Sequence, residues 1–228
     1  MQNLDLENID CHATLAITKN TQSGRSMIEM LGVLAIIGVL SVGGIAGYSK
    51  AMQKYRINKT IDQITLIAGN VRSFFAPQRS YADLILAGSH RVMNSNLIRK
   101  AKLIPEEMWD NGSFSNVYGH GVGIAPAYKF SPGDQQAFMI EYVLPLDEEL
   151  CIGLASQDWS TAEVKGIYLG GAGGWWFAIT IPTDMDNVIT KCSDAVSKVS
   201  RFGTYMYAYF YFDVNSNCWS ETNGNTCS

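Results

Sequence analysis

A run of nineteen residues without a charge, Met30–Tyr48, constrains this chain more than any other feature of its sequence. At a rise of about 1.5 Å per residue, a helix of that length spans the hydrocarbon core of a bilayer, which is roughly 30 Å thick. A single carboxylate, Glu29, lies directly before the run, and Gly24 and Arg25 precede it by a few residues. A candidate cleavage site, an acid and a membrane span therefore lie next to one another.

This arrangement resembles the amino terminus of type IV prepilins. In that family a prepilin peptidase cuts after a glycine, and the fifth residue of the mature chain is glutamate. Cutting after Gly24 makes Arg25 the first mature residue and Glu29 the fifth. The long leader is similar to that of type IVb pilins, although the first mature residue of the family is usually apolar. The resemblance is strong from Gly24 to about Phe75 and is one of pattern only beyond it.

Two other interpretations of the apolar run remain open from the sequence, an uncleaved signal anchor and a secretory signal cleaved near Gly44, Ile45 and Ala46. A cleavable signal peptide has an apolar region of about 7–15 residues. The nineteen uncharged residues exceed that length, which favours the prepilin interpretation.

The resemblance implies an α+β fold in which a long amino-terminal helix packs against an antiparallel sheet. It divides the chain into a cytoplasmic leader (1–24), a membrane-spanning or filament-core half-helix (25–48) and a globular domain (49–228). It also implies amino-terminal methylation and location in the bacterial inner membrane with a periplasmic carboxyl-terminal domain, followed by an extracellular pilus. The implied partners are other copies of the chain and other pilins, the prepilin peptidase, the membrane, and the assembly ATPase and platform.

The residues after Ser49 continue a helical pattern, because apolar side chains recur at steps of three, four and seven. This pattern predicts one helix from about Ser26 to Phe75, ended by Pro77, since the residue before a proline disfavours helix. The predicted core stripe consists of Met52, Tyr55, Ile61, Ile64, Ala68, Val71 and Phe75.

The rest of the domain reads as short helices followed by strands. The predicted helices are Asn96–Ile104, Asp147–Ala155 with Asp147 as the N-cap, and Asn187–Val199. Stretches rich in aromatic and β-branched residues predict strands at Val117–Ile124, Ala137–Val143, Gly166–Leu169, Trp175–Thr180 and Tyr205–Phe212. The aromatic stretch Tyr205–Phe212 is open to two interpretations, a core strand or an exposed surface for adhesion or subunit contact.

The chain has five cysteines, and the first, Cys11, lies in the expected leader. The other four form an even set downstream of an export signal, which is typical of two disulfides in an oxidising compartment, although four free thiols remain the alternative. Four cysteines allow three pairings, and we choose Cys151 with Cys192 and Cys218 with Cys227, because this pairing closes one loop between two predicted helices and one short loop in the tail without crossing. No metal site is predicted, since the spacing of His90 and His120 to the cysteines is unlike that of zinc ligands.

Charge argues against the expected topology at one point. Lys50, Lys54, Arg56 and Lys59 follow the apolar run, whereas the positive-inside rule places such residues on the cytoplasmic side. We set this bias aside because large domains translocate largely regardless of charge, and because paired cysteines need the oxidising side.

The predicted function is structural. The chain contains neither a G-x-S-x-G nor an H-E-x-x-H motif, so catalysis and cofactors are not predicted, and a membrane-tethered periplasmic enzyme is the less favoured alternative. A net charge of −4 without a long basic run argues against nucleic acid as a partner. A minor pilin, a secretion pseudopilin and an adhesin at a filament tip remain alternatives to a main filament subunit.

Overall fold

The computed structural model describes residues 27–78, 80–87, 92–127, 136–171, 176–181 and 184–213. The chain divides into two compact units, Met1–Gly47 and Tyr48–Ser228, which are described separately. The long helix α1 (Met27–Phe75) contributes residues to both. The predicted helix from Ser26 to Phe75 is thus confirmed to within one residue.

In the first unit, residues 27–47 are helical and every one of them is exposed. In the second unit, α1 buries one face, and the buried residues recur at steps of three and four, as expected for an amphipathic helix. Two expectations for the stripe change here. Tyr55 is 56% exposed, whereas two polar residues, Thr60 and Gln63, join the buried face. The buried residues of α1 are Thr60, Gln63, Ile64, Ile67, Ala68, Val71 and Phe75.

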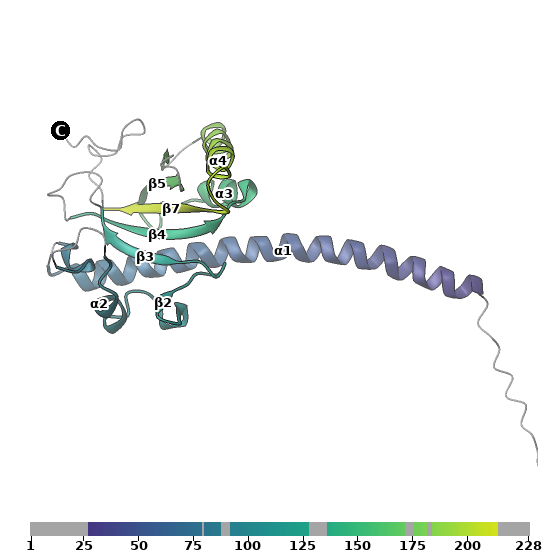
Figure 1. Cartoon of the computed structure of the whole chain (residues 1–228), viewed down its shortest axis with the longest axis horizontal. Helices are drawn as coiled ribbons and strands as arrows, with labels where there is room; N and C mark the ends of the chain where they lie inside the picture. Colours follow the sequence, from purple (N-terminus) through teal and green to yellow (C-terminus); the bar gives the residue numbers. More distant parts are fainter. Residues whose placement is uncertain are drawn as a thin grey trace, which may run out of the picture. The chain divides into compact units, whose positions relative to one another are not determined.

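The second unit contains an antiparallel five-stranded sheet in the order β3-β4-β7-β5-β6 (Figure 1). The strands are β3 (Val122–Pro126), β4 (Phe138–Pro145), β5 (Val164–Gly170), β6 (Trp176–Thr180) and β7 (Tyr205–Phe212). The last strand along the chain, β7, lies in the middle, paired with β4 over its whole length and with β5 on its other side. The sheet confirms the predicted α+β class.

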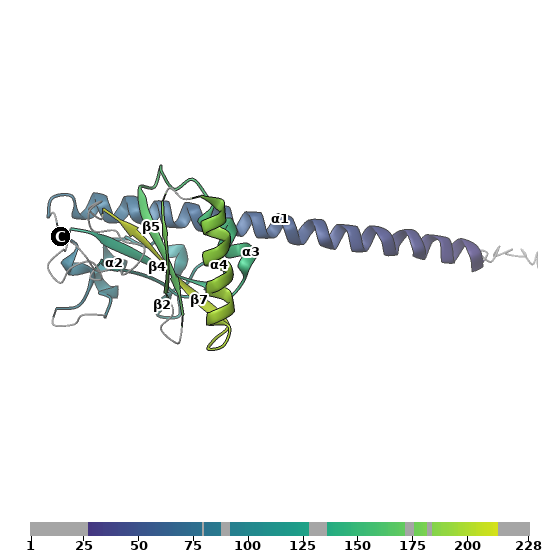
Figure 2. The same ribbon diagram turned by 90° about the horizontal axis from the view of Figure 1, so that it is seen from above.

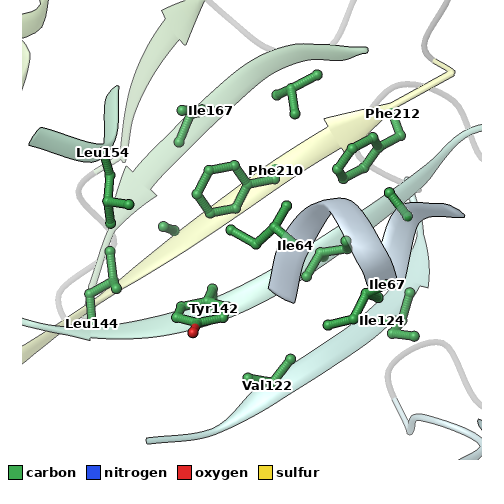
Figure 3. Close-up of a cluster of buried hydrophobic side chains, with 14 of the residues drawn as sticks. Ile64, Ile67, Val122, Ile124, Tyr142, Leu144, Leu154, Ile167, Phe210 and Phe212 are labelled. Atoms are coloured by element: carbon green, nitrogen blue, oxygen red, sulfur yellow. The ribbon is translucent and has the colours of Figure 1, made fainter. Parts of the chain in front are cut away.

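One face of the sheet forms the main hydrophobic core. Ile64 and Ile67 of α1 point toward Phe210 and Phe212 of β7 and toward Tyr142 of β4 (Figure 3). Ile140 pairs with Phe210 and Tyr142 pairs with Ala208, so alternate residues of both strands face α1. Burying this face removes large aromatic and aliphatic side chains from water, which is the main favourable term in folding.

Two further helices cover the β5–β6 part of the core. They are α3 (Glu148–Ala155) and α4 (Met185–Val199), which lie beside each other (Figures 1 and 2). The Asp147 side chain accepts a hydrogen bond from the Leu150 amide at 2.7 Å, which confirms it as the N-cap of α3. Asp184 caps α4 in the same way through the Asn187 amide.

The shorter elements depart most from the sequence predictions. Helix α2 (Ser95–Lys100) ends before the predicted Ile104, because Lys102 adopts a positive φ of 51° and the Leu103 amide donates to the Ile98 carbonyl. That geometry is a left-handed helix end. The remaining short elements are two 3₁₀ turns, Ala82–Leu84 and Glu106–Met108, and a small hairpin of β1 (Trp109–Asp110) and β2 (Ser113–Phe114).

Strand β3 starts at Val122, not at the predicted Val117. The Asn116 side chain accepts hydrogen bonds from the backbone amides of Tyr118 and His120, and it donates to the Val143 carbonyl at 2.7 Å. Asparagine stabilises turns through such bonds to nearby backbone. A turn therefore replaces the first residues of the predicted strand.

Candidate functional site

The residues predicted to direct processing and assembly lie at the start of the chain. Gly24 and Arg25 fall outside the described residues. Glu29 lies in the first turn of α1 and is exposed. A carboxylate is favoured there, because it interacts with the positive end of the helix dipole.

Behind Glu29, α1 presents an apolar surface on all sides. Met27 is 87% exposed, Leu40 69% and Val42 71%, and this part of α1 is long and apolar enough to cross a membrane. A helix that is apolar all round is stable only in lipid or in a protein interior. The surface of residues 27–47 therefore requires one of these two environments.

The disulfide predicted between the helices is present. Cys151 of α3 is bonded to Cys192 of α4, with their Cα atoms 5.7 Å apart. The bond closes a loop of 41 residues in sequence separation, for which the chain-entropy model gives about 4 kcal/mol of stabilisation. Cys218 and Cys227 lie outside the described residues, so their pairing stays a prediction.

Arg72 forms the main polar link between α1 and the end of the sheet. Its Nη2 and Nε atoms lie 2.8 Å and 3.0 Å from Oδ1 of Asp213, the residue that follows β7. Nη2 also lies 3.2 Å from Oε2 of Glu163, and Nη1 donates to the Ala162 carbonyl. One guanidinium thus connects the last turn of α1, the end of β7 and the loop before β5.

Tyr81 completes this cluster. Its hydroxyl donates to Oδ2 of Asp213 at 2.7 Å. Burial, and then the hydrogen bond to the Asp213 carboxylate, raise the pKa of Tyr81, so the phenol stays protonated and remains a donor. Both oxygens of Asp213 therefore have partners, which a half-buried carboxylate requires.

A second polar cluster lies inside the core, where α1 crosses β4. The Tyr142 hydroxyl donates to Oε1 of Gln63 at 2.6 Å, and the Thr60 hydroxyl donates to the Arg56 carbonyl at 2.9 Å. Tyr142 and Thr60 have no exposed surface, and Gln63 is 6% exposed. Burial raises the pKa of Tyr142. A donor and an acceptor buried together fix the position of the helix on the sheet more specifically than apolar contacts do.

The face of the sheet away from α1 carries tyrosines. Tyr205 is 42% exposed, and the rings of Tyr207 and Tyr209 stack with centroids 6.3 Å apart. Glu141 pairs with Tyr209 across β4 and β7, and desolvation by burial raises the pKa of its carboxyl. Among the tyrosines of β7 on this face, only Tyr205 is exposed, since Tyr207 and Tyr209 are half-buried and Tyr211 is buried. The core-strand interpretation of β7 is therefore confirmed, whereas a role of this face in adhesion or subunit contact stays a prediction.

The structure offers few candidates for catalysis. Among the residues that the structure describes, no group of three His, Cys, Asp or Glu side chains is arranged to hold a metal ion. His120 lies in an irregular segment between Gly119, which has a φ of 75°, and Gly121.

The two polar clusters were not predicted from the sequence. Arg72 and Asp213 are 141 residues apart, and Gln63 and Tyr142 are 79 residues apart, so no local spacing signals either pair. One signal was present for Gln63 and Thr60. In a helical projection, both lie on the same side of α1 as Ile64 and Ile67, so that two polar residues fall on the apolar face of the helix.

Comparisons with known proteins agree with these observations. A family model described as PilS N terminal matches residues 54–201, which is more than half of the chain. The major structural subunit of the bundle-forming pilus of Escherichia coli O127:H6 (strain E2348/69 / EPEC) is 23% identical over 159 residues, which cover 68% of this chain and 75% of that protein. The match includes the amphipathic half of α1 and most of the sheet, and with the fold it shows that this chain belongs to the type IV pilin family.

Proposed function

We propose that this protein is a pilus subunit that is held in the inner membrane by residues 30–48, cut after Gly24 and then polymerised into an extracellular filament. The observation that carries the proposal is the exposed apolar surface of α1 from Met27 to Gly47 in a chain of the pilin family. Lipid covers such a surface before assembly, and neighbouring helices cover it afterwards.

Glu29 is the residue to which we assign a role in assembly. Cleavage after Gly24 frees a positively charged amine on Arg25, four residues before the carboxylate. A carboxylate inside a bilayer is costly, and although the position of Glu29 at the edge of the span lowers that cost, such a residue is still a functional candidate by default. In a filament core of low dielectric, the Glu29 carboxylate of an incoming copy gains most by pairing with the Arg25 amine or guanidinium of a copy already in place.

A main filament subunit is favoured over the alternatives by one finding. The relative that covers two thirds of this chain is a major structural subunit. A minor pilin, a pseudopilin or a tip adhesin would be present at few positions, whereas a main subunit is present along the whole filament. Labelled antibodies against the second unit should therefore decorate filaments along their length in electron micrographs. Labelling confined to the tips would favour the adhesin.

The role of Glu29 is tested by Glu29→Gln, which keeps the shape of the side chain and removes its charge. We expect normal export, normal cleavage and a folded domain, but fewer than about one tenth of the wild-type number of filaments, since 1.4 kcal/mol of lost pairing already gives a factor of ten. The matched control is Glu149→Gln on α3, an exposed carboxylate distant in sequence from the apolar run. Wild-type filament numbers for Glu29→Gln would contradict the pairing mechanism.

A further inference from the structure

The first two cations after the apolar run stand apart from the next two. Lys50 and Lys54 are exposed, and in the described part of the chain neither lies within salt-bridge distance of a carboxylate. Arg56, in contrast, lies over the ring of Tyr118, with 5.9 Å from its Cζ atom to the centroid. Lys59 is paired with Glu107 at 3.4 Å.

The segment around these lysines has the composition of a membrane interface. No acidic residue occurs between Glu29 and Asp62, whereas four cations lie between Tyr48 and Asp62. Two tyrosines accompany them on α1, Tyr48 at 67% and Tyr55 at 56% exposure. Tyrosines are enriched where membrane meets water, and basic side chains are attracted to anionic head groups.

Of the four cations, Lys50 and Lys54 lie nearest along α1 to the end of the uncharged run. At about 1.5 Å per residue, Lys50 lies about 3 Å and Lys54 about 9 Å beyond Tyr48, the last residue of the uncharged run. The head-group region extends roughly 5–8 Å beyond the hydrocarbon core on each side. Because lysine side chains are long and flexible, the amines of Lys50 and Lys54 can both reach this region. Arg56 and Lys59 lie farther away, about 12 Å and 16 Å beyond Tyr48.

We propose that Lys50 and Lys54 bind the head groups of anionic phospholipids, such as phosphatidylglycerol, at the surface of the membrane that holds the unassembled subunit. The inference rests on the proposed function, because it requires residues 30–48 to be inserted in a bilayer. The two lysines then set the depth of the helix in the membrane, and extraction into a filament breaks the contact. Lys50 and Lys54, which the positive-inside rule would place on the cytoplasmic side, thus have a role in lipid binding on the opposite side.

The full-length protein, reconstituted in vesicles with equal amounts of phosphatidylglycerol and phosphatidylcholine, provides the test. Carbonate extraction first shows whether the protein is integrated, and release by carbonate would count against the membrane step of the proposed function itself. For integrated protein, native mass spectrometry after transfer to detergent counts the two lipids that stay bound. We expect roughly a 25-fold excess of phosphatidylglycerol for the wild-type protein, about fivefold for each of the two lysines.

Lys50→Gln with Lys54→Gln should lower that excess by about fivefold for each lysine removed. The matched control is Lys100→Gln with Lys102→Gln, which removes the same charge from two exposed lysines near the end of α2. An integrated wild-type protein that binds both lipids equally would overturn the proposal. Equal losses of the phosphatidylglycerol excess in the two double variants would also overturn it. An unchanged lipid preference with fewer filaments would assign the two lysines to a neighbouring copy and would also overturn it.

Discussion

At the scale of single residues, the cluster around Arg72 is the contact most sensitive to substitution. The side chains of Arg72 and Asp213 are 25% and 28% exposed, which places the pair between a surface ion pair and a buried one. Arg72→Met removes the charge that compensates Asp213 and leaves a half-buried carboxylate with Tyr81 as its remaining partner. We expect a loss of about 1.5–3 kcal/mol in the free energy of unfolding, measured by urea denaturation.

A double-mutant cycle separates the pair from other effects of the substitution. Asp213→Asn alone should destabilise the protein, and Asp213→Asn combined with Arg72→Met should cost clearly less than the sum of the two single changes. Additive losses would show that Arg72 and Asp213 do not stabilise each other.

Glu141 gives a prediction about pH. Burial raises the pKa of its carboxyl in the folded protein, so folding disfavours the ionised form. Its cost to stability is therefore fully present above the raised pKa and disappears as the pH falls toward 4.5, the ordinary value for a glutamate. Glu141→Gln should thus raise the Tm at pH 7.5 and leave it unchanged near pH 4.

Thermal unfolding followed by circular dichroism at the two pH values checks this expectation. Glu149→Gln on α3 serves as the control for the change in net charge. A Tm gain for Glu141→Gln that is the same at both pH values would disprove the burial argument.

Single residues differ in how well the sequence predicted them. Asp147 and Cys151 were correctly placed, because a helix cap and a cysteine pair follow from local spacing and from chemistry. The partners of Arg72 and Gln63 lie on distant strands and depend on how α1 packs on the sheet, which no local pattern records.

At the scale of elements, two glycines show how closely the helices approach their neighbours. A Cβ atom on Gly171, after β5, would lie 2.5 Å from Cγ1 of Val199 on α4, whereas a Cβ on Gly153 of α3 would lie 2.7 Å from Cδ1 of Ile57 on α1. The valine side chain is branched at Cβ and stiff, but the end of an isoleucine can rotate away. The two sites should therefore respond differently to alanine.

We expect Gly171→Ala to lower the free energy of unfolding by about 1–3 kcal/mol, the usual cost of overpacking. Gly153→Ala should be close to neutral, because a gain of about 1 kcal/mol in helix propensity offsets the smaller clash. Urea denaturation of both variants provides the comparison. The argument fails if Gly153→Ala proves the more destabilising of the two.

Among the elements, the ends of the longest ones were predicted most closely, whereas α2 and β3 were predicted with one wrong end each and the β1–β2 hairpin was not predicted. Helix α1 has a helical apolar pattern that continues up to the stop signal of Pro77, and β7, an unbroken aromatic-rich stretch, matches its predicted bounds. The end of α2 depends on one residue with positive φ, and the start of β3 depends on the hydrogen bonds of Asn116. Such details arise from side-chain bonds that override the apolar pattern.

For the whole molecule, the apolar surface of residues 27–47 links the proposed membrane insertion, cleavage and assembly into a filament. Residues 27–47 form a helix whose apolar side chains are exposed, which is unfavourable in water. The second unit has a hydrophobic core of its own. The boundary between the two units falls between Gly47 and Tyr48, close to the point where charged residues reappear in α1. The sequence assigns separate roles to residues 25–48 and 49–228, and that division stays a prediction. What it could not supply was the order of the strands, which depends on contacts between distant parts of the chain.

The amino-terminal sequence of the protein in extracellular filaments shows whether the chain is cut after Gly24 and polymerised. Filaments are sheared from cells of the native host, and the subunit is analysed by amino-terminal sequencing and intact mass. The account predicts a chain that starts at Arg25 and carries a methyl group on its amine. A start at Met1 or at Gly47, or the absence of this protein from the filaments, would contradict it.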